Sequence, residues 1–237
     1  MEPRTAVFIT AYNEASTLDS ILASMPDWDV FIIDDGSTDG TPAIANGYGA
    51  HVISHPINLG QGAAVITAFR VLSFKDYDIV IEMDGDGQHD PAEIPKFVET
   101  LERSGADIVA GSRLLGSNYD GAPLSRRLML YPLTWTLNLL TGYRISDSMC
   151  GFRAFRGTAI QKLAPILNDM VETEYIASEM WLRFAELGLS ATEVPINLAS
   201  RKTGGSYKGH AFAKYGVGII RTILRTLLES YRVRGQS

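Results

Sequence analysis

Carboxylates and glycines gather directly after two apolar stretches of the chain, and they are the residues best suited to chemistry. Residues 30–33 are followed by the acidic run 34–41, and residues 79–83 are followed by Asp-Gly-Asp-Gly-Gln at 84–88. Both apolar stretches are typical of buried strands. Because ligands of open α/β sheets bind outside the carboxyl ends of the strands, we expect both clusters to face one crevice.

Asp84 and Asp86 point to a divalent cation. Carboxylate oxygens are hard ligands for Mg²⁺ or Mn²⁺, and such an ion can neutralise a diphosphate. The alternative is that acidic residues at strand ends form turns or cap helices. Because two clusters follow two strands, the interpretation as a metal and diphosphate site is the stronger one.

Composition limits the class of protein. The 237 residues suit one large α/β domain. A net charge of −6 argues against a nucleic-acid-binding protein, which usually has a basic face. One cysteine, Cys150, excludes a disulfide framework, and we expect it to pack in the core. We see no signal peptide after Met1 and no apolar run long enough to cross a bilayer, so the expected location is the cytoplasm.

The order of elements predicts an α/β fold with a mainly parallel sheet and helices on both faces. The pair Gly60 and Gly62 is expected to form a tight turn before a helix rather than a phosphate loop. Ser16 or Thr17 is expected to cap the first helix. Strands are expected over 5–11, 30–33, 51–54, 78–83, 107–110 and 191–195, and helices over 16–25, 41–49, 63–72, 90–103, 124–140, 171–187 and 212–231.

Several motifs follow one another in an order that resembles the family 2 glycosyltransferases of the GT-A fold. The nearest subgroup is the dolichol- or polyprenol-phosphate mannose synthases and related polyprenyl-phosphate sugar transferases. The resemblance covers residues 5–208 and implies a Rossmann-like, mainly parallel central sheet. The motifs are Thr10-Ala11-Tyr12-Asn13-Glu14, Asp34 to Thr41, Asn58-x-Gly60-x-Gly62, Asp84 to Gln88, Gly111-Ser112-Arg113 and Asp147-x-x-x-Gly151-Phe152-Arg153.

The resemblance also implies a division of the chain. A catalytic domain would span residues 1–210, with a nucleotide-sugar-binding half at 1–112 and an acceptor-binding half at 113–210. An amphipathic helix would follow at 211–237. The expected donor is a nucleotide-diphosphate sugar, with GDP-mannose first and UDP-glucose or UDP-N-acetylglucosamine next.

The resemblance assigns the donor and metal contacts to the first half. Mg²⁺ or Mn²⁺ would be held by Asp84, Asp86 and Gln88, as a Lewis acid that stabilises the departing nucleotide diphosphate. Thr10 stands where proline is usual in the family, which should leave the strand end freer. The expected donor-binding residues are Thr10, Tyr12, Glu14, Asp35, Asp84, Gly85 and Gln88.

Arginines and lysines of the second half indicate an anionic acceptor, because arginine binds phosphate in fork geometry. By the resemblance the acceptor is a polyprenyl or dolichyl phosphate, and the glycine-rich loop 201–208 is a mobile acceptor loop. Each arginine taken singly has the alternative of a solvated charge or a surface ion pair. The expected acceptor-phosphate contacts are Arg113, Arg126, Arg153, Arg201 and Lys208.

The predicted chemistry depends on the acceptor. A phosphate oxygen is already ionised, so inversion at the sugar would need alignment and charge stabilisation, with Asp86 and Arg113 as catalytic residues. A hydroxyl acceptor would need a base, and Asp147 is the candidate, with capping of the turn before Gly151 as its alternative role. A nucleotidyltransferase or a non-catalytic nucleotide-sugar-binding protein is the hypothesis from another class.

Two amphipathic segments suggest a membrane surface. The helix over 124–140 is expected to lie on the cytoplasmic face of a membrane, with packing on the domain itself as the alternative. The C-terminal helix is expected to pack on the domain or to form a homodimer contact. The acidic residues Glu172, Glu174 and Glu179 are expected to be charges of a helix surface or a first helical turn.

Overall fold

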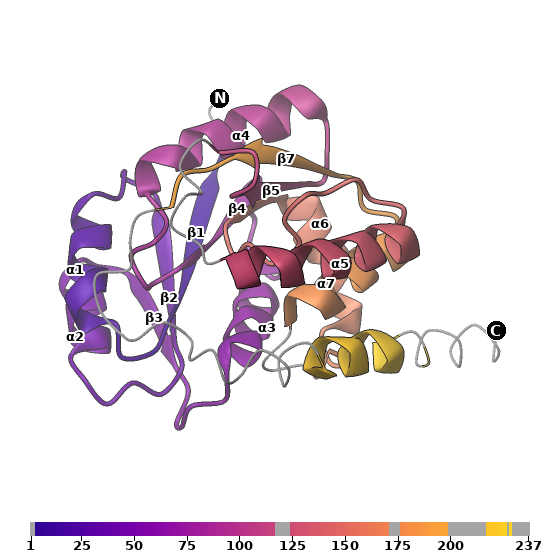
Figure 1. The fold of residues 1–237 in the computed structure, drawn as a ribbon. Helices are drawn as coiled ribbons and strands as arrows, with labels where there is room; N and C mark the ends of the chain where they lie inside the picture. The colour runs from indigo at the N-terminus through magenta and orange to yellow at the C-terminus, as the bar shows by residue number, and fades with distance from the viewer. Residues whose placement is uncertain (1–2, 117–123, 171–175, 199–216, 227, 229–237) are drawn as a thin grey trace.

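One seven-stranded sheet forms the centre of the protein, in the order β3-β2-β1-β4-β6-β5-β7 (Figure 1). All pairs are parallel except those of β6, which runs antiparallel to β4 and β5. The predicted α/β fold with a mainly parallel sheet is therefore confirmed. This computed structural model describes residues 3–116, 124–170, 176–198, 217–226 and 228, with the backbone alone at 124–130.

The elements alternate along the chain as the predicted pattern requires. The expected strands at 5–11, 51–54 and 191–195 have these bounds in the structure. The elements are β1 (Thr5–Ala11), α1 (Ala15–Ala23), β2 (Asp29–Asp34), α2 (Thr41–Gly47), β3 (His51–Ser54), α3 (Gln61–Leu72), β4 (Ile79–Asp84), η1 (Pro91–Glu93), α4 (Ile94–Ser104), β5 (Ile108–Ser112), α5 (Leu124–Thr141), β6 (Arg153–Arg156), α6 (Gly157–Leu163), η3 (Ala164–Ile166), α7 (Ile176–Glu186) and β7 (Ala191–Pro195).

Helices cover both faces of the sheet, which explains why β1 carries an unbroken apolar run over residues 6–9. All seven residues of β1 are buried, and its apolar side chains alternate between two hydrophobic clusters. Ala6 and Phe8 pack with residues of α3, α6 and α7, whereas Val7 and Ile9 pack with residues of α1 and α4. The sheet is thus the middle of three layers, and its carboxyl edge is left for ligands.

The predicted cap of the first helix is wrong. Thr17 lies inside α1, where its hydroxyl donates to the backbone oxygens of Glu14 at 3.0 Å and Gly85 at 2.7 Å. The residue before the helix is Glu14, and it makes no side-chain capping bond. Thr17 therefore ties the start of α1 to the turn between Asp84 and Asp86.

Strand β6 was not expected from the sequence, and it brings the second half of the chain into the same sheet. It pairs with both β4 and β5, so one sheet runs across the predicted division at residue 112. Because β6 is antiparallel, its first residue, Arg153, lies beside the carboxyl ends of β4 and β5. The loop that precedes β6 therefore reaches the edge where the predicted ligands bind.

Residues 217–226 form a helix that packs on the domain, as one of the two predictions for it proposed. Ile219 and Ile223 are buried in the cluster that also contains residues of α3, α5, α6 and α7. Arg225 forms an ion pair with Glu179 of α7 at 3.4 Å. Glu179 lies in the first turn of α7, as one of the two expectations for it proposed, and it is fully buried rather than on the helix surface. Among the helices described, none is long and apolar enough to cross a membrane.

Candidate active site at the carboxyl edge of the sheet

The acidic run 34–41 largely braces its own loop. Asp34 accepts a hydrogen bond from the backbone N–H of Ser37 at 3.0 Å, and Asp39 accepts from Thr41 N at 2.9 Å and from Ala15 N at 3.2 Å. Asn13, in the left-handed region at a φ of 54°, accepts from Thr38 N at 2.8 Å. The ends of β1 and β2 are thereby joined into one rigid rim.

Asp35 is predicted to contact the donor, but its side chain is buried and is hydrogen-bonded within the protein. It is 3% exposed, and its carboxylate accepts from Leu59 N at 2.9 Å and Gly60 N at 2.8 Å while it lies 2.8 Å from His55 Nδ1. Asp35 therefore holds the turn that leads into α3. Gly60 has a φ of 96° at this turn, a backbone conformation that favours glycine. The expectation of a tight turn rather than a phosphate loop stays a prediction.

Tyr12 and Glu14 follow β1 at the same edge. Tyr12 is 45% exposed, and Glu14 receives a hydrogen bond from the Thr17 hydroxyl at its Oε2 atom at 3.1 Å. The Glu14 backbone N–H donates to Thr41 Oγ1 at 3.0 Å. Tyr12 is thus accessible at this edge, and contact of Tyr12 and Glu14 with the donor stays a prediction.

Asp84 closes β4 as a half-buried carboxylate. Burial raises its pKa, and this is opposed by the charges of Arg153 and Arg113 and by hydrogen bonds from Gln61 and Thr10. Its carboxylate has Gly151 directly beside it, because a Cβ at that position would lie 2.6 Å from Asp84 Oδ2. The glycine of the Asp-x-x-x-Gly-Phe-Arg motif therefore leaves room for this carboxylate.

Asp86 lies in the turn that follows β4, two residues after Asp84. This turn fixes the orientation of the Asp86 side chain. Asp86 Oδ1 accepts from the backbone N–H of Gln88 at 3.0 Å, and Gly87 has a φ of 75°. A half-buried carboxylate with a second one two residues later suits a divalent cation. Within the described part of the chain, no three His, Cys, Asp or Glu side chains converge to hold a metal ion by themselves. Asp84 and Asp86 would therefore share the ion with donor phosphate and water oxygens, and the Gln88 amide stays a predicted ligand.

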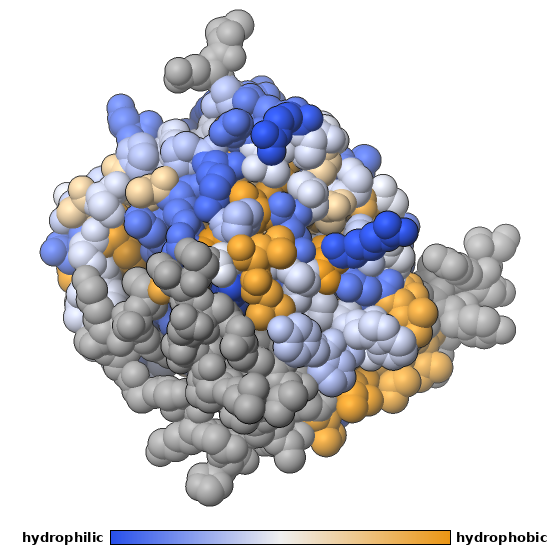
Figure 2. Space-filling model, turned by 45° about the horizontal axis from the view of Figure 1, so that its top comes forward, coloured by the Kyte–Doolittle hydropathy of each residue, from blue (hydrophilic) through white to orange (hydrophobic). Residues whose placement is uncertain are grey.

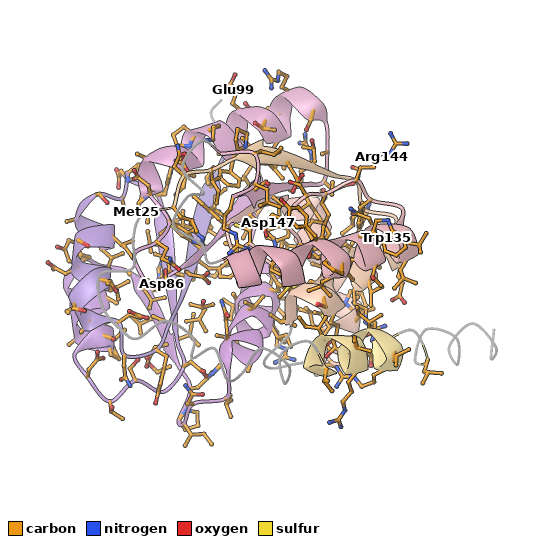
Figure 3. All side chains as sticks on the ribbon, in the orientation of Figure 1. Met25, Asp86, Glu99, Trp135, Arg144 and Asp147 are labelled. Atoms are coloured by element: carbon orange, nitrogen blue, oxygen red, sulfur yellow. The ribbon has the colours of Figure 1, made fainter. Side chains whose placement is uncertain are left out.

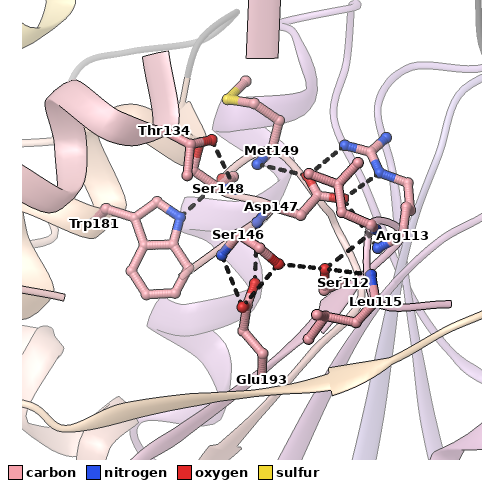
Figure 4. Close-up of polar contacts among 11 residues, drawn as sticks. Ser112, Arg113, Leu115, Thr134, Ser146, Asp147, Ser148, Met149, Trp181 and Glu193 are labelled. Atoms are coloured by element: carbon pink, nitrogen blue, oxygen red, sulfur yellow. Dashed lines mark hydrogen bonds and ion pairs between the residues drawn. The ribbon is translucent and has the colours of Figure 1, made fainter. Parts of the chain in front are cut away.

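Arg113 follows β5 and is locked by Asp147 (Figure 4). Its Nε donates to Asp147 Oδ2 at 2.5 Å and its Nη2 donates to Asp147 Oδ1 at 2.7 Å. Both side chains are buried, at 7% and 1% exposure of the residues. A bidentate pair of this kind fixes the plane of the guanidinium. The positive charge of Arg113 also lowers the pKa of Asp84 and of His89, so this cation acts electrostatically on the end of β4.

The loop that carries Asp147 is held by α5 and α7 as well. The Ser148 hydroxyl hydrogen bonds to that of Thr134 on α5 at 2.8 Å, and Trp181 Nε1 of α7 donates to Ser148 O at 2.8 Å. Figure 3 shows Asp147 near the middle of the molecule beside α5, whereas Trp135 projects outward from the same helix. Helix α5 thus directs Thr134 toward the site and Trp135 away from the domain.

The prediction that Arg153 binds the acceptor phosphate does not fit this structure. Arg153 is 2% exposed, and its Nη1 donates to Glu82 Oε2 at 3.1 Å across the β4–β6 pair. Its guanidinium carbon lies 5.8 Å from the centre of the Trp181 ring. Burial raises the pKa of Glu82 to about 7 despite this partner. Arg153 therefore neutralises a core carboxylate.

The other predicted acceptor contacts are only partly placed. Arg126 lies on α5, but its side chain is outside the described residues, as are Arg201 and Lys208 altogether. Glu172 and Glu174 are outside them too. Cys150 is buried, as expected.

Two residues of the site had no signal in the sequence. Gln61, the first residue of α3, donates from Nε2 to Asp84 Oδ1 at 2.7 Å. Glu193 of β7 accepts from Ser146 N at 2.7 Å and from Asp147 N at 3.0 Å. Each contacts a residue far away in the chain, so spacing along the sequence could not have found either of them.

Known proteins resemble this chain over most of its length. The family model described as "Glycosyl transferase family 2" matches residues 6–164. An undecaprenyl-phosphate mannosyltransferase of Micrococcus luteus is 30% identical over 98% of this chain and 98% of its own length. A polyprenol monophosphomannose synthase of Mycolicibacterium smegmatis is 30% identical over 86% of this chain and 80% of its own length.

A solved structure supports the fold. The glucosyl-3-phosphoglycerate synthase of Mycobacterium tuberculosis, in complex with Mn²⁺, uridine-diphosphate-glucose and phosphoglyceric acid, superposes with a TM-score of 0.72 at 22% identity. The match covers 95% of this chain and 80% of that one. At this identity the likeness shows the GT-A fold alone.

The assignment of Arg153 to the core is testable by stability. Arg153→Met should lower the free energy of unfolding by about 3–5 kcal/mol, because Glu82 stays buried without its partner. Urea denaturation measures this, with the exposed Arg103→Met as control. The double variant Glu82→Leu/Arg153→Met should recover most of the loss. Wild-type stability in Arg153→Met would show that the pair is not a core ion pair.

Proposed function

Because the chain belongs to glycosyltransferase family 2, in the group of the polyprenyl-phosphate sugar transferases, we propose that it transfers a hexose from a nucleotide-diphosphate sugar to a polyprenyl phosphate. The observation that carries the proposal is the meeting of two opposite charges at one sheet edge. Asp84 ends β4 as a half-buried carboxylate, and Arg113 follows β5 as a cation whose plane is fixed by Asp147. The names of the relatives from Micrococcus luteus and Mycolicibacterium smegmatis support the lipid acceptor.

In the proposed reaction an oxygen of the acceptor phosphate forms a bond to the anomeric carbon of the sugar. The bond between that carbon and the donor diphosphate breaks, the nucleoside diphosphate leaves with the electron pair, and the configuration inverts. A divalent cation held by Asp84 and Asp86 would supply Lewis-acid stabilisation of the leaving diphosphate. Arg113 would hold the acceptor phosphate and Tyr12 would pack against the nucleoside, so catalysis is mostly alignment and charge stabilisation.

The environment of Asp147 favours a phosphate acceptor over a hydroxyl acceptor. A hydroxyl would need a general base, and Asp147 was the candidate for that role. Its carboxylate, however, already accepts hydrogen bonds from Arg113 Nε and Nη2 and from Met149 N. A buried carboxylate engaged in this way is a poor base, because taking up a proton would break the pair with Arg113.

Mannose is the proposed sugar and GDP-mannose the proposed donor. The two relatives named above are a mannosyltransferase and a monophosphomannose synthase, which supports mannose. UDP-glucose and UDP-N-acetylglucosamine are the alternatives. Mg²⁺ or Mn²⁺ is the proposed cofactor, and the Mn²⁺ in the complex of the Mycobacterium tuberculosis enzyme supports a divalent ion.

A transfer assay tests this function. Radiolabelled GDP-mannose, UDP-glucose or UDP-N-acetylglucosamine is incubated with a short polyprenyl phosphate and Mg²⁺ or Mn²⁺, and label in the organic phase is counted. We expect label from GDP-mannose, and a loss of at least about a hundredfold in Asp86→Ala, because the leaving diphosphate loses its cation.

The matched control is Asp76→Ala, which removes an exposed aspartate before β4, at the opposite edge of the sheet. It should transfer like the wild type. Label from a UDP-sugar alone would contradict mannose. A donor that is hydrolysed while no lipid is labelled would contradict the lipid acceptor and make a hydroxyl acceptor the leading hypothesis.

We further propose that two exposed apolar stripes rest on the membrane that holds the acceptor. On α5, Tyr131, Trp135 and Leu139 recur every fourth residue at 54, 66 and 69% exposure. Helix 217–226 buries Ile219 and Ile223 but exposes Val217, Ile220 and Leu224 on another face. Figure 2 shows a hydrophobic strip at the lower right, the side on which Figure 1 draws helix 217–226.

The composition of these stripes fits a lipid surface. Tyrosine and tryptophan are enriched at membrane interfaces, and an exposed arginine, Arg221, lies beside the second stripe, where it would attract anionic headgroups. Thr134 on the inner face of α5 contacts the loop of Asp147, so the lipid-facing helix also borders the site. An acceptor whose tail stays in the bilayer would then meet the carboxyl edge of the sheet.

Vesicle flotation tests this surface. Vesicles of phosphatidylcholine and phosphatidylglycerol should bind the wild type. The double variant Trp135→Ser/Leu139→Ser should lower the partition constant by at least about tenfold, because less apolar area is then buried in the membrane on binding. Phe74→Ser, which removes a residue 85% exposed before β4, is the matched control and should float like the wild type. Equal flotation of all three proteins would contradict the proposed surface.

A further inference from the structure

Glu193 of β7 lies behind the Arg113–Asp147 pair and contacts neither the acceptor nor the donor in the proposed reaction. We propose that Glu193 is a positioning residue that fixes the loop 145–149 and, through it, the orientation of Arg113 for the acceptor phosphate. The proposal rests on the proposed function, because it assigns Arg113 to that phosphate.

The contacts of Glu193 converge on two consecutive residues (Figure 4). Its Oε2 atom accepts from Ser146 N at 2.7 Å and from the Ser146 hydroxyl at 2.9 Å. Its Oε1 atom accepts from Asp147 N at 3.0 Å. One carboxylate thus holds the backbone of both residues, which leaves the loop little freedom to rotate Asp147.

The same carboxylate is tied to the strand that carries Arg113. Glu193 stands opposite Ala110 in the register of β5 and β7, and the Ser146 hydroxyl hydrogen bonds to that of Ser112 at 2.6 Å. Ser112 Oγ in turn accepts from Leu114 N at 3.2 Å and Leu115 N at 3.3 Å. Strand β7 therefore helps to position both the backbone around Arg113 and the backbone of Asp147.

The fork between Arg113 and Asp147 needs this support, because its geometry is narrow. The Arg113 backbone N–H and side chain both donate to Asp147, at 3.2 Å for N and 2.5 Å for Nε with Oδ2. If the loss of one hydrogen bond allowed the loop to shift, both carboxylate oxygens of Asp147 would move together. Reacting groups misplaced by about 1 Å lose much of the advantage of alignment, so the second layer of contacts has a functional consequence.

The accepting capacity of the Glu193 carboxylate is what the loop uses. Burial raises the pKa of Glu193, and the hydrogen bonds from Asp147 and Ser146 act in the opposite sense. A neutral amide in the same place could not replace all these bonds, because its NH₂ group would face N–H donors. Glu193→Gln is therefore a sharp substitution, since it keeps the size of the side chain and removes part of its accepting capacity.

Two readouts separate positioning from a merely structural role. Without substrate, amide hydrogen exchange at Ser146 and Asp147 should quicken by at least about tenfold in Glu193→Gln. In the transfer assay the KM for polyprenyl phosphate should rise by at least about fivefold, while the KM for the nucleotide sugar stays within about twofold, because only the acceptor-binding cation is displaced. Glu99→Gln, an exposed glutamate of α4, is the matched control.

Each result decides the proposal. Faster exchange with an unchanged acceptor KM, or an equal rise in both KM values, would show that Glu193 is structural only and would overturn it. If the wild type labels no lipid at all, the proposed function fails. Unchanged exchange at Ser146 and Asp147 in Glu193→Gln overturns the positioning role whatever the acceptor is.

Discussion

The buried pair of Arg113 and Asp147 is the interaction on which the second half of the structure depends. A guanidinium and a carboxylate removed from water must match in geometry, because the loss of solvation is otherwise uncompensated. Several other residues stabilise the backbone around this pair. Glu193 binds the backbone of Asp147, and Thr134 and Trp181 bind Ser148. Ser112 binds the backbone that follows Arg113. Strand β7, helices α5 and α7 and the end of β5 are thereby brought to one position.

Charges are balanced across the sheet in the same way. Glu82 and Arg153 face one another on adjacent strands inside the core, two residues before the strand end that carries Asp84. Arg153 of this core pair supplies one positive charge near Asp84, and Arg113 supplies another at the edge of the sheet. In the rim formed by residues 34–41, Asp34 and Asp39 accept hydrogen bonds from nearby backbone N–H groups, and Asp35 holds the turn that leads into α3. Asp84 ends β4 and Asp86 follows two residues later, a spacing of carboxylates that suits a divalent cation, which is why the second acidic cluster, rather than the first, is the proposed metal site.

The sequence indicated the layers of the fold but not the partners within the site. β1 could be predicted because all its residues are buried, and buried parallel strands are apolar on both faces. β6 could not, because Arg153 and Arg156 begin and end it, and their core partners lie on β4 and before β5. For the same reason Arg153 looked like a phosphate ligand, and Gln61 and Glu193 carried no signal. Motifs report which residues are special, whereas long-range contacts decide what each of them binds.

The central claim is that Arg113, held in a fork by Asp147, receives the phosphate of a lipid acceptor. The most direct measurement is the kcat/KM for polyprenyl phosphate of Arg113→Lys, together with the affinity for the nucleotide sugar. Lysine keeps the charge but cannot form the fork, so kcat/KM should fall by at least about a hundredfold while donor affinity is unchanged. Transfer at the wild-type rate, or a loss of donor affinity in place of acceptor turnover, would contradict the account.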